Sequence, residues 1–326
     1  MRHVGLSFVL VSALAACGGD GSGAPNDATT TPDSNVIDPP TRGFQIVSKD
    51  VTIPPGEEHT YCYYFRTPNT EPMVIKSWHS VMAPGSHHMI MFTTGQTDKM
   101  PPGTVSESGC GLTAQGTSVP VWTYAAQNPD TTVDLPADDG TGKPLGQEIP
   151  ANTAGFFQMH YLNSTDAPLV VHVTLNANAY DAGAAYTRTE AFITFNSQIS
   201  IGPGATGVVA AQTCNAPAGA KFWMLSTHAH KQAVKTEVVN GPANGTDVAF
   251  SSTDWEHPGA MIFAAPFYSF SSGKFTYRCT YDNTGDNANN TVTTGDSAAT
   301  DEMCMGTGYY FPATKPLFCL NSLGPF

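Results

Sequence analysis

The feature that most constrains this fold is the dense punctuation of the chain by turn-forming residues, with no helical pattern between them. The 326 residues include 31 glycines and 25 prolines. The intervals carry short apolar runs, such as residues 61–65, 156–161 and 169–175. No long stretch places apolar residues at the 3.6-residue spacing of a helix. Short runs between glycine and proline turns are typical of strands, so the pattern predicts an all-β protein.

Two domains of nearly equal size are expected. A chain of 326 residues is long enough for two separate cores. Residues 177–187 are small and polar and provide a natural connection. We therefore predict two antiparallel β-sandwich, jelly-roll-like domains in tandem, over residues 42–183 and 184–326.

The acidic net charge makes one class of binding partner unlikely. Charged residues make up 13% of the chain, and the formal net charge is −13 with 14 basic residues. Because this acidic excess repels a phosphate backbone, nucleic acid is not expected as a partner.

The N-terminus has the pattern of a targeting segment. Arg2 precedes an apolar run that is too short to span a bilayer and ends in Leu14-Ala15-Ala16-Cys17. This order resembles a bacterial lipoprotein signal, which predicts a signal segment over residues 1–17 and a lipid on Cys17; an ordinary signal peptide with a chance cysteine is the alternative. Residues 18–41 are polar and small and predict a flexible linker. The chain is thus expected in the bacterial cell envelope, on the periplasmic face or the outer surface, touching the membrane through its lipid alone.

The remaining cysteines predict a disulfide framework. Without Cys17 the number is even, and an exported chain meets an oxidising compartment. Fifteen pairings of six cysteines are conceivable. Metal binding by thiolates is the competing use, but no C-x-x-C spacing occurs. The six are Cys62, Cys110, Cys214, Cys279, Cys304 and Cys319.

The sequence Thr227-His228-Ala229-His230 offers two imidazoles on one side of a strand. Residues i and i+2 of an extended chain point to the same face. A pair of surface histidines is the alternative. The apolar lead-in over residues 222–225 favours a buried strand that delivers the pair to a strand end or a cleft.

Two further histidine positions are candidates. His87 and His88 are adjacent and would face opposite ways on a regular strand. Both can reach one metal only where the chain is irregular, which Gly85 permits, or where one imidazole turns its other nitrogen; one core and one surface histidine is the alternative. His160 lies within an apolar strand, and a lone histidine in such a strand is more often a hydrogen-bonded core residue than a ligand.

Met303 supplies the element that would make such a site selective. Methionine is normally core filler. A thioether beside two imidazoles, however, favours Cu(I), and imidazole suits both oxidation states of copper. Three histidines in one half, with two histidines and a methionine in the other, would form two chemically different copper sites.

With these pieces the chain resembles the copper type II, ascorbate-dependent monooxygenases, the family of peptidylglycine α-hydroxylating monooxygenase and dopamine β-monooxygenase. The resemblance covers residues 43–326. The matching pieces, in the family's order, are His87-His88-Met89, Gln158-Met159-His160-Tyr161, Thr227-His228-Ala229-His230, Glu256-His257-Pro258 and Glu302-Met303-Cys304.

The resemblance assigns roles by matching position. His87, His88 and His160 resemble the ligands of an electron-transfer copper, while His228, His230 and Met303 resemble those of an oxygen-binding, catalytic copper. It also implies the disulfides Cys62–Cys110, Cys214–Cys319 and Cys279–Cys304, the last of which would hold the backbone next to Met303.

The implied activity is hydroxylation of an sp³ C–H bond of a small organic substrate. It would use O₂, two copper ions per chain, and ascorbate or another one-electron reductant, with the two coppers facing each other across an interdomain cleft. A monomer is expected. One alternative is a copper-binding or copper-delivery lipoprotein of the same fold without catalysis, and another is a structural lipoprotein whose histidines are incidental; retention of the whole ligand set disfavours the second.

Three positions depart from the peptide-hydroxylating members. Ser226 and Thr307 stand where those enzymes have an arginine and a tyrosine that hold the substrate carboxylate, and Met305 stands in place of an asparagine. Glycine-extended peptides are therefore not expected as substrates. A second set of residues is predicted to line an apolar pocket or, alternatively, to belong to the core: Trp223, Tyr309, Tyr310 and Phe311.

Overall fold

The computed structural model describes residues 37–108, 110 and 120–325. These residues belong to one compact unit. About 51% of the chain is strand and no helix occurs in the described part, which confirms the all-β prediction. None of the described residues forms a helix that could cross a membrane. The signal segment, Cys17 and most of the expected linker lie outside the described residues.

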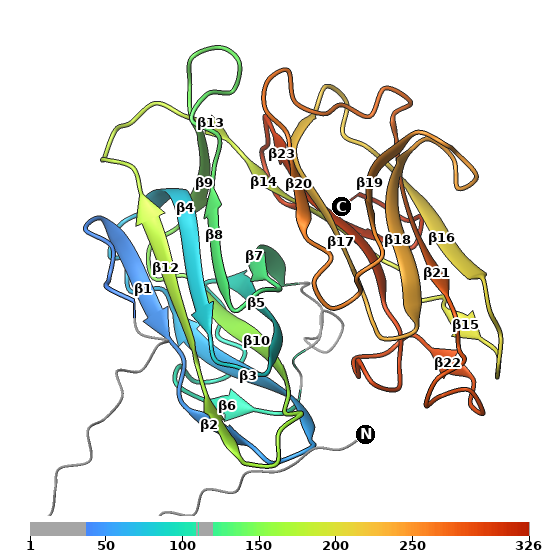
Figure 1. The fold of residues 1–326 in the computed structure, drawn as a ribbon. Helices are drawn as coiled ribbons and strands as arrows, with labels where there is room; N and C mark the ends of the chain where they lie inside the picture. The colour runs from blue at the N-terminus through green and yellow to red at the C-terminus, as the bar shows by residue number, and fades with distance from the viewer. Residues whose placement is uncertain (1–36, 109, 111–119, 326) are drawn as a thin grey trace, which may run out of the picture. The chain divides into compact units, whose positions relative to one another are not determined.

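The first half is built from two large sheets and a small ribbon (Figure 1). The six-stranded sheet pairs β1 (Gly43–Val47), β12 (Val173–Ala179), β4 (Met73–Met82), β9 (Leu145–Ile149) and β13 (Thr187–Arg188), with β8 (Asp130–Asp134) beside β4. The five-stranded sheet has the order β6 (Val105–Ser106), β3 (Glu58–Arg66), β10 (Ala154–Leu162), β5 (Ser86–Gly95) and β7 (Val121–Ala126). The ribbon pairs β11 (Leu169–Val171) with β2 (Val51–Ile53).

The second half repeats this plan. One sheet has the order β20 (Ala260–Ile262), β17 (Lys221–Ala229), β23 (Cys304–Phe311), β14 (Glu190–Phe195) and β24 (Leu317–Leu320). The other has the order β16 (Val208–Asn215), β21 (Lys274–Tyr281), β18 (Ala233–Asn240) and β19 (Val248–Ser252). A ribbon pairs β15 (Ser200–Ile201) with β22 (Val292–Thr293).

The sheets change over between β13 and β14, close to the boundary predicted after residue 183. Pairing is antiparallel with two exceptions, because β13 runs parallel to β9 and β14 parallel to β24. One apolar core lies around Trp78 and Phe157 and also contains Trp223 and Phe311 of the second half, and another lies around Phe222 and Phe275. A third apolar cluster, which includes Ile90, Trp122, Phe156, Ile193 and Met305, draws residues from both halves.

The structure contains all three disulfides that the resemblance implies. Cys62 of β3 pairs with Cys110. The other two bridges, Cys214–Cys319 and Cys279–Cys304, each join one large sheet of the second half to the other. The second half is thus cross-linked twice between its layers.

Because side chains alternate along a strand, one face of a sheet in each half contributes side chains to the third cluster. On β10, Phe157 and Met159 enter the first core while Phe156 belongs to the third cluster. Gln158 and His160 share the side of Phe156, because alternate residues of a strand face the same way. The same rule places His88 beside Ile90 on β5.

In the second half the equivalent face belongs to β17 and β23. Met224, Ser226 and His228 alternate along β17, and Met305, Thr307 and Tyr309 alternate along β23. Register pairing sets His228 opposite Met305 and Ser226 opposite Thr307. The sequence positions singled out for ligands and substrate therefore share one sheet face.

Candidate metal centre

A β-bulge brings His87 and His88 to the same place. In the pairing of β10 with β5, His160 lies opposite His88 and Tyr161 lies opposite Ser86, so His87 is the additional residue. Gly85, just before the strand, has φ +84°. A side chain there would be strained by the backbone and would crowd Leu169. The irregularity expected from the adjacent histidines is therefore present.

His87, His88 and His160 form a buried group with the spacing of a metal site. One ligand atom from each of the three lies within 4.8 Å of the others. Their ring centroids are 5.0 to 5.1 Å apart. Among the described residues this is the one group of three or more histidines, cysteines or carboxylates close enough to hold an ion.

Hydrogen bonds fix which nitrogen of His160 and His88 is free. Glu58 Oε1 accepts from His160 Nε2 at 2.6 Å, which leaves His160 Nδ1 with its lone pair. Gln158 donates its Nε2 to the carbonyl oxygen of Cys110 at 2.8 Å, so its Oε1 faces His88 Nε2 at 3.4 Å. His88 therefore keeps its lone pair on Nδ1, and that atom accepts a hydrogen bond from His87 Nδ1 at 2.8 Å.

Glu58 also contacts Ser297 and Ala298 in addition to His160. Its Oε1 also accepts from the backbone N–H of Ala298 at 2.8 Å, and its Oε2 is 3.4 Å from Ser297 Oγ. Burial alone would raise the pKa of Glu58, but the hydrogen bond and charge of His160 with the Ala298 N–H lower that pKa to about 2. An ionised carboxylate thus orients His160 and also holds the loop before Met303.

His228 and His230 present the opposite nitrogen. Gln127 donates Nε2 to the Thr227 carbonyl oxygen at 3.4 Å, so its Oε1 accepts from His228 Nδ1 at 3.0 Å. His230 Nδ1 donates to the Asp301 carbonyl oxygen at 3.3 Å. Each histidine is left with a free Nε2, as metal ligands oriented by outer hydrogen bonds commonly are.

Glu302 holds the end of the His228–His230 segment. Its buried carboxylate accepts backbone N–H groups from His230 at 3.0 Å, Gln232 at 2.6 Å and Met303 at 3.2 Å. Burial raises the pKa of Glu302 to about 8, although these donors act in the opposite direction. Three hydrogen bonds to one side chain thereby join the histidine pair to Met303.

The imidazoles of the two halves lie in one cluster, which departs from the expected cleft between two separate sites. The His88 and His228 ring centroids are 5.0 Å apart, and those of His87 and His228 are 5.8 Å apart. Within the second half, His228 and His230 are separated by 5.3 Å. His160 and His230 close the group at 6.5 Å.

Four of the five imidazoles are held in their neutral form by their surroundings. Burial, with neighbouring imidazoles, lowers the pKa of His87 to about 3 and that of His230 to about 4. It also lowers the pKa values of His88 and His228 well below their usual range. Nε2 of His87 and Nε2 of His230 are buried and meet no hydrogen-bond partner in the described part of the chain. Buried lone pairs of neutral imidazoles fit a copper ion.

Met303 shares a small cavity with these rings. The cavity measures about 40 Å³, near the volume of one water molecule, and is lined by His88, His160, His228, His230 and Met303, among others. Met305 also borders it. The six residues predicted as ligands are therefore brought together, and the donor set of imidazoles and one thioether suits copper.

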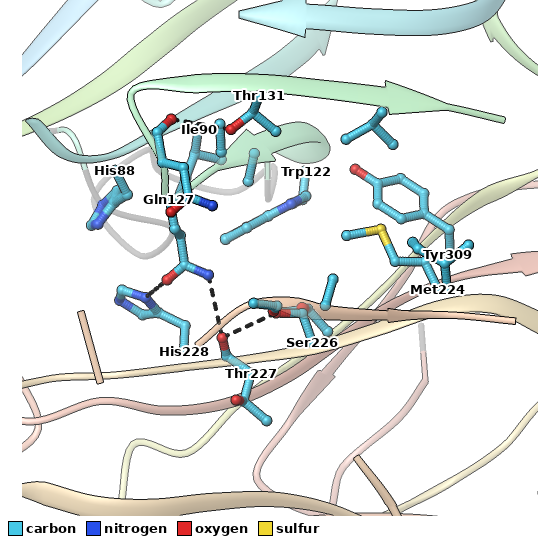
Figure 2. A pocket seen from close by; sticks show the side chains of 18 of the residues that line it. His88, Ile90, Trp122, Gln127, Thr131, Met224, Ser226, Thr227, His228 and Tyr309 are labelled. Atoms are coloured by element: carbon cyan, nitrogen blue, oxygen red, sulfur yellow. Dashed lines mark hydrogen bonds between the residues drawn. The ribbon is translucent and has the colours of Figure 1, made fainter. Parts of the chain in front are cut away.

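A larger cavity of about 430 Å³ opens beside the cluster (Figure 2). Figure 2 shows His88 and His228 at one side, Met224 and Tyr309 at the other, and Trp122 between them. Ser226 and Thr307 line the cavity as well. Two of the three positions that depart from the peptide-hydroxylating enzymes thus face this space, and Met305 faces the small one.

The aromatic residues near the ligands divide between core and cavity. Tyr309 lines the large cavity and stacks on Trp223 with ring centroids 5.3 Å apart. The other three aromatic residues are buried in the cores, which was the stated alternative to lining a pocket; they are Trp223, Tyr310 and Phe311.

Three residues that contact the histidine cluster belong to none of the motifs seen in the sequence. Glu58 and Gln127 orient His160 and His228, but neither lies in a motif. Trp255 stacks on His87 with ring centroids 5.2 Å apart and covers that imidazole. A carboxylate ahead of an alternating apolar strand was the signal available for Glu58, and many surface glutamates share that pattern.

Comparison with known protein families supports copper binding by the second half. Residues 189–325 match the family model described as copper type II ascorbate-dependent monooxygenase, C-terminal domain. No curated protein matches the chain.

Among solved structures, the chain is similar to the exported protein XepA of PBSX, with 8% identity and a TM-score of 0.23, covering 84% of this chain and 89% of that one. It is similar to PBCV-1 VP54 with 9% identity and a TM-score of 0.25, covering 86% and 96%. Similarity at this level carries no argument about function.

Proposed function

We propose that this chain, whose residues 189–325 match the C-terminal domain model of the copper type II ascorbate-dependent monooxygenases, is a copper monooxygenase that hydroxylates an sp³ C–H bond of a small organic molecule. Overall, one C–H bond becomes C–O–H, and the second oxygen atom of O₂ leaves as water. Two electrons and two protons balance the reaction, with the electrons coming from two one-electron oxidations of ascorbate or a similar reductant.

The chain's residues would hold two copper ions. Nδ1 of His88 and His160, with His87, would hold one, and Nε2 of His228 and His230, with Met303, would hold the other. When bound, the metal supplies one-electron redox chemistry and activation of dioxygen. The mixed nitrogen and sulfur set differs from the all-nitrogen set in softness, which gives the two positions different preferences for Cu(I).

The protein's own part is orientation and exclusion of water. Glu58, Gln158 and Gln127 each hold the outer nitrogen of one imidazole, so the inner nitrogen keeps its direction. The imidazoles are buried. The large cavity lets a substrate lie against His88 and His228 without entering the cluster itself.

One observation carries this proposal. Five buried imidazoles, two of which keep a buried Nε2 without a hydrogen-bond partner in the described part of the chain, form a cluster that borders a cavity of substrate size, in a chain whose residues 189–325 match the family's C-terminal domain. A structural lipoprotein would have no physical reason to bury the unpartnered nitrogens of His87 and His230, because each such atom destabilises the fold.

Metal analysis and oxygen uptake test the proposal on the purified chain from residue 18 onward. We expect two copper ions per chain and ascorbate-dependent O₂ uptake matched one to one by a hydroxylated product from a panel of small aromatic and aliphatic compounds. A chain that binds no copper refutes the proposal. A chain that binds two coppers but couples no oxygen uptake to product would instead be a copper-binding or copper-delivery protein of the same fold.

We further propose that the chain acts as a monomer in the bacterial cell envelope, anchored through Cys17. The sequence of residues 14–17 supports the anchor. Metabolic labelling with a radioactive fatty acid tests it, and a Cys17→Ser chain should carry no label.

A further inference from the structure

Part of the wall of the large cavity is formed by apolar side chains. Ile90 and Trp122 come from the first half, and Ile193, Met224 and Tyr309 come from the second. A volume of about 430 Å³ lies within the usual range for small-molecule sites. His88 and His228 line the cavity, so a molecule inside it lies against the imidazole cluster.

Several polar side chains on the walls are already hydrogen-bonded within the protein. Ser226 Oγ donates to the Gly259 carbonyl oxygen at 2.6 Å, and Tyr309 Oη donates to the Thr123 carbonyl oxygen at 3.1 Å. Both ends of the Gln127 amide are used, one by His228 and the other by the backbone at residue 227, as Figure 2 shows. A ligand with several hydrogen-bonding groups would have to compete with these bonds.

The cavity also has no positive charge to receive an anion. Among the described residues that line it, no lysine or arginine occurs, and Asp134 is the one charged side chain. Asp134 is exposed on β8, where water screens it. An ionised carboxylate placed in this cavity would be desolvated without a partner.

The mouth has exposed apolar side chains as well as the exposed polar residues Asn128, Thr132 and Asp134. Ile262 lines the cavity and is 57% exposed, and its neighbour Met261 is 45% exposed. Both lie on β20, the edge strand of its sheet. Large apolar side chains in water beside a cavity favour the approach of an apolar molecule.

We infer that the substrate is an uncharged, apolar small molecule, and that the site discriminates against carboxylates and ammonium groups. This inference rests on the proposed function. It concerns the cavity walls alone, so binding can be measured on the metal-free protein, where failure of the copper chemistry has no effect.

Three probes with one carbon skeleton test the charge preference: propylbenzene, 3-phenylpropanoate and 3-phenylpropylamine. Titration calorimetry on the metal-free chain should show propylbenzene binding, with 3-phenylpropanoate at least about tenfold weaker because its charge is buried unpaired. The amine should also bind more weakly than propylbenzene. Absence of propylbenzene binding, or tighter binding of either ion, overturns the inference.

A pair of equally exposed positions supplies matched variants. Ile262→Arg places a cation at the mouth and should strengthen 3-phenylpropanoate about two- to fivefold, the range of an exposed ion pair. Val209→Arg adds the same charge on β16 at a residue that is also 57% exposed but does not line the cavity. Equal strengthening by both variants, or none by Ile262→Arg, contradicts the assignment of the mouth.

The outcome separates this inference from the proposed function. If propylbenzene binds and the copper-loaded chain forms no hydroxylated product, the copper monooxygenase proposal fails and the substrate class stands. If the loaded chain hydroxylates carboxylates better than neutral molecules, the substrate class fails and the monooxygenase stands.

Discussion

Glu58→Gln isolates the effect of charge on metal binding from the effect of hydrogen bonding. Oε1 of Glu58 accepts both from His160 Nε2 at 2.6 Å and from the Ala298 N–H at 2.8 Å. An amide oxygen in the place of Oε1 can accept both bonds, while its NH₂ group faces Ser297 Oγ, which lies 3.4 Å from Oε2. The variant therefore keeps the contacts and loses the negative charge.

The magnitude follows from the strength of that bond. Hydrogen bonds to charged groups contribute about 1.5–3 kcal/mol and neutral ones about 0.5–1.5 kcal/mol, so the substitution weakens the support of His160 by roughly 1–1.5 kcal/mol. Copper affinity of the three-histidine group should fall about tenfold, in line with the usual effect of losing an outer carboxylate. The melting temperature should change little, because the bonds to Ala298 and Ser297 are retained.

Competition with a coloured copper chelator measures the affinity, and differential scanning calorimetry measures the fold. Glu57→Gln is the matched control. Glu57 is the preceding residue, it is exposed, and its carboxylate contacts His59 at 2.7 Å outside the cluster. Wild-type affinity in Glu58→Gln, or an equal loss in Glu57→Gln, would refute the role given to Glu58.

Three more variants test other parts of the molecule. Gln127→Leu removes the acceptor for His228 Nδ1, so copper binding by that histidine should weaken about tenfold or more while O₂ uptake falls, as chelator competition and an oxygen electrode would show. Met303→Ala should weaken Cu(I) binding more than Cu(II) binding and abolish hydroxylation with an unchanged circular dichroism spectrum; unchanged turnover refutes that ligand assignment. Glu237 accepts a hydrogen bond from Arg278 Nε at 2.6 Å and lies 2.8 Å from Lys235 Nζ. Burial alone would raise the pKa of Glu237, but these two cations lower it below its usual 4.5. The stabilising effect of the Glu237 carboxylate is therefore complete above pH 4.5 and lost at lower pH. Glu237→Gln should show a smaller fall in melting temperature between pH 6 and pH 3 than the parent chain. An equal fall in both proteins would contradict this prediction.

The parts of the site that depend on local pattern could be predicted from the sequence. Alternation along a strand is a short-range rule, so it placed His228 and His230 together. Adjacent residues of a regular strand face opposite ways, so His87 and His88 could share one site only on an irregular strand. The β-bulge at His87 is that irregularity. Apolar runs between turns were sufficient for the all-β class.

The contacts between distant strands could not be predicted in the same way. Glu58 meets His160 across 102 residues, and Gln127 meets His228 across 101. Nothing near either residue in the sequence marks its partner, since that pairing depends on how sheets pack. For the same reason the sequence led to an expectation of separate sites, whereas the structure brings His88 and His228 to 5.0 Å between ring centroids.

The bridge between Cys279 and Cys304 sets an order for maturation. Cys304 follows Met303 directly, and its partner lies on the other sheet of the second half. While both thiols are reduced, hydrogen bonds such as those from Met303 to Glu302 and from Tyr281 to Met303 restrain the thioether without a covalent link. Oxidation of the two thiols would then precede full assembly of the mixed nitrogen and sulfur site. A chain kept in a reducing medium is expected to hold copper through histidines first and to recruit the thioether when the bridge closes.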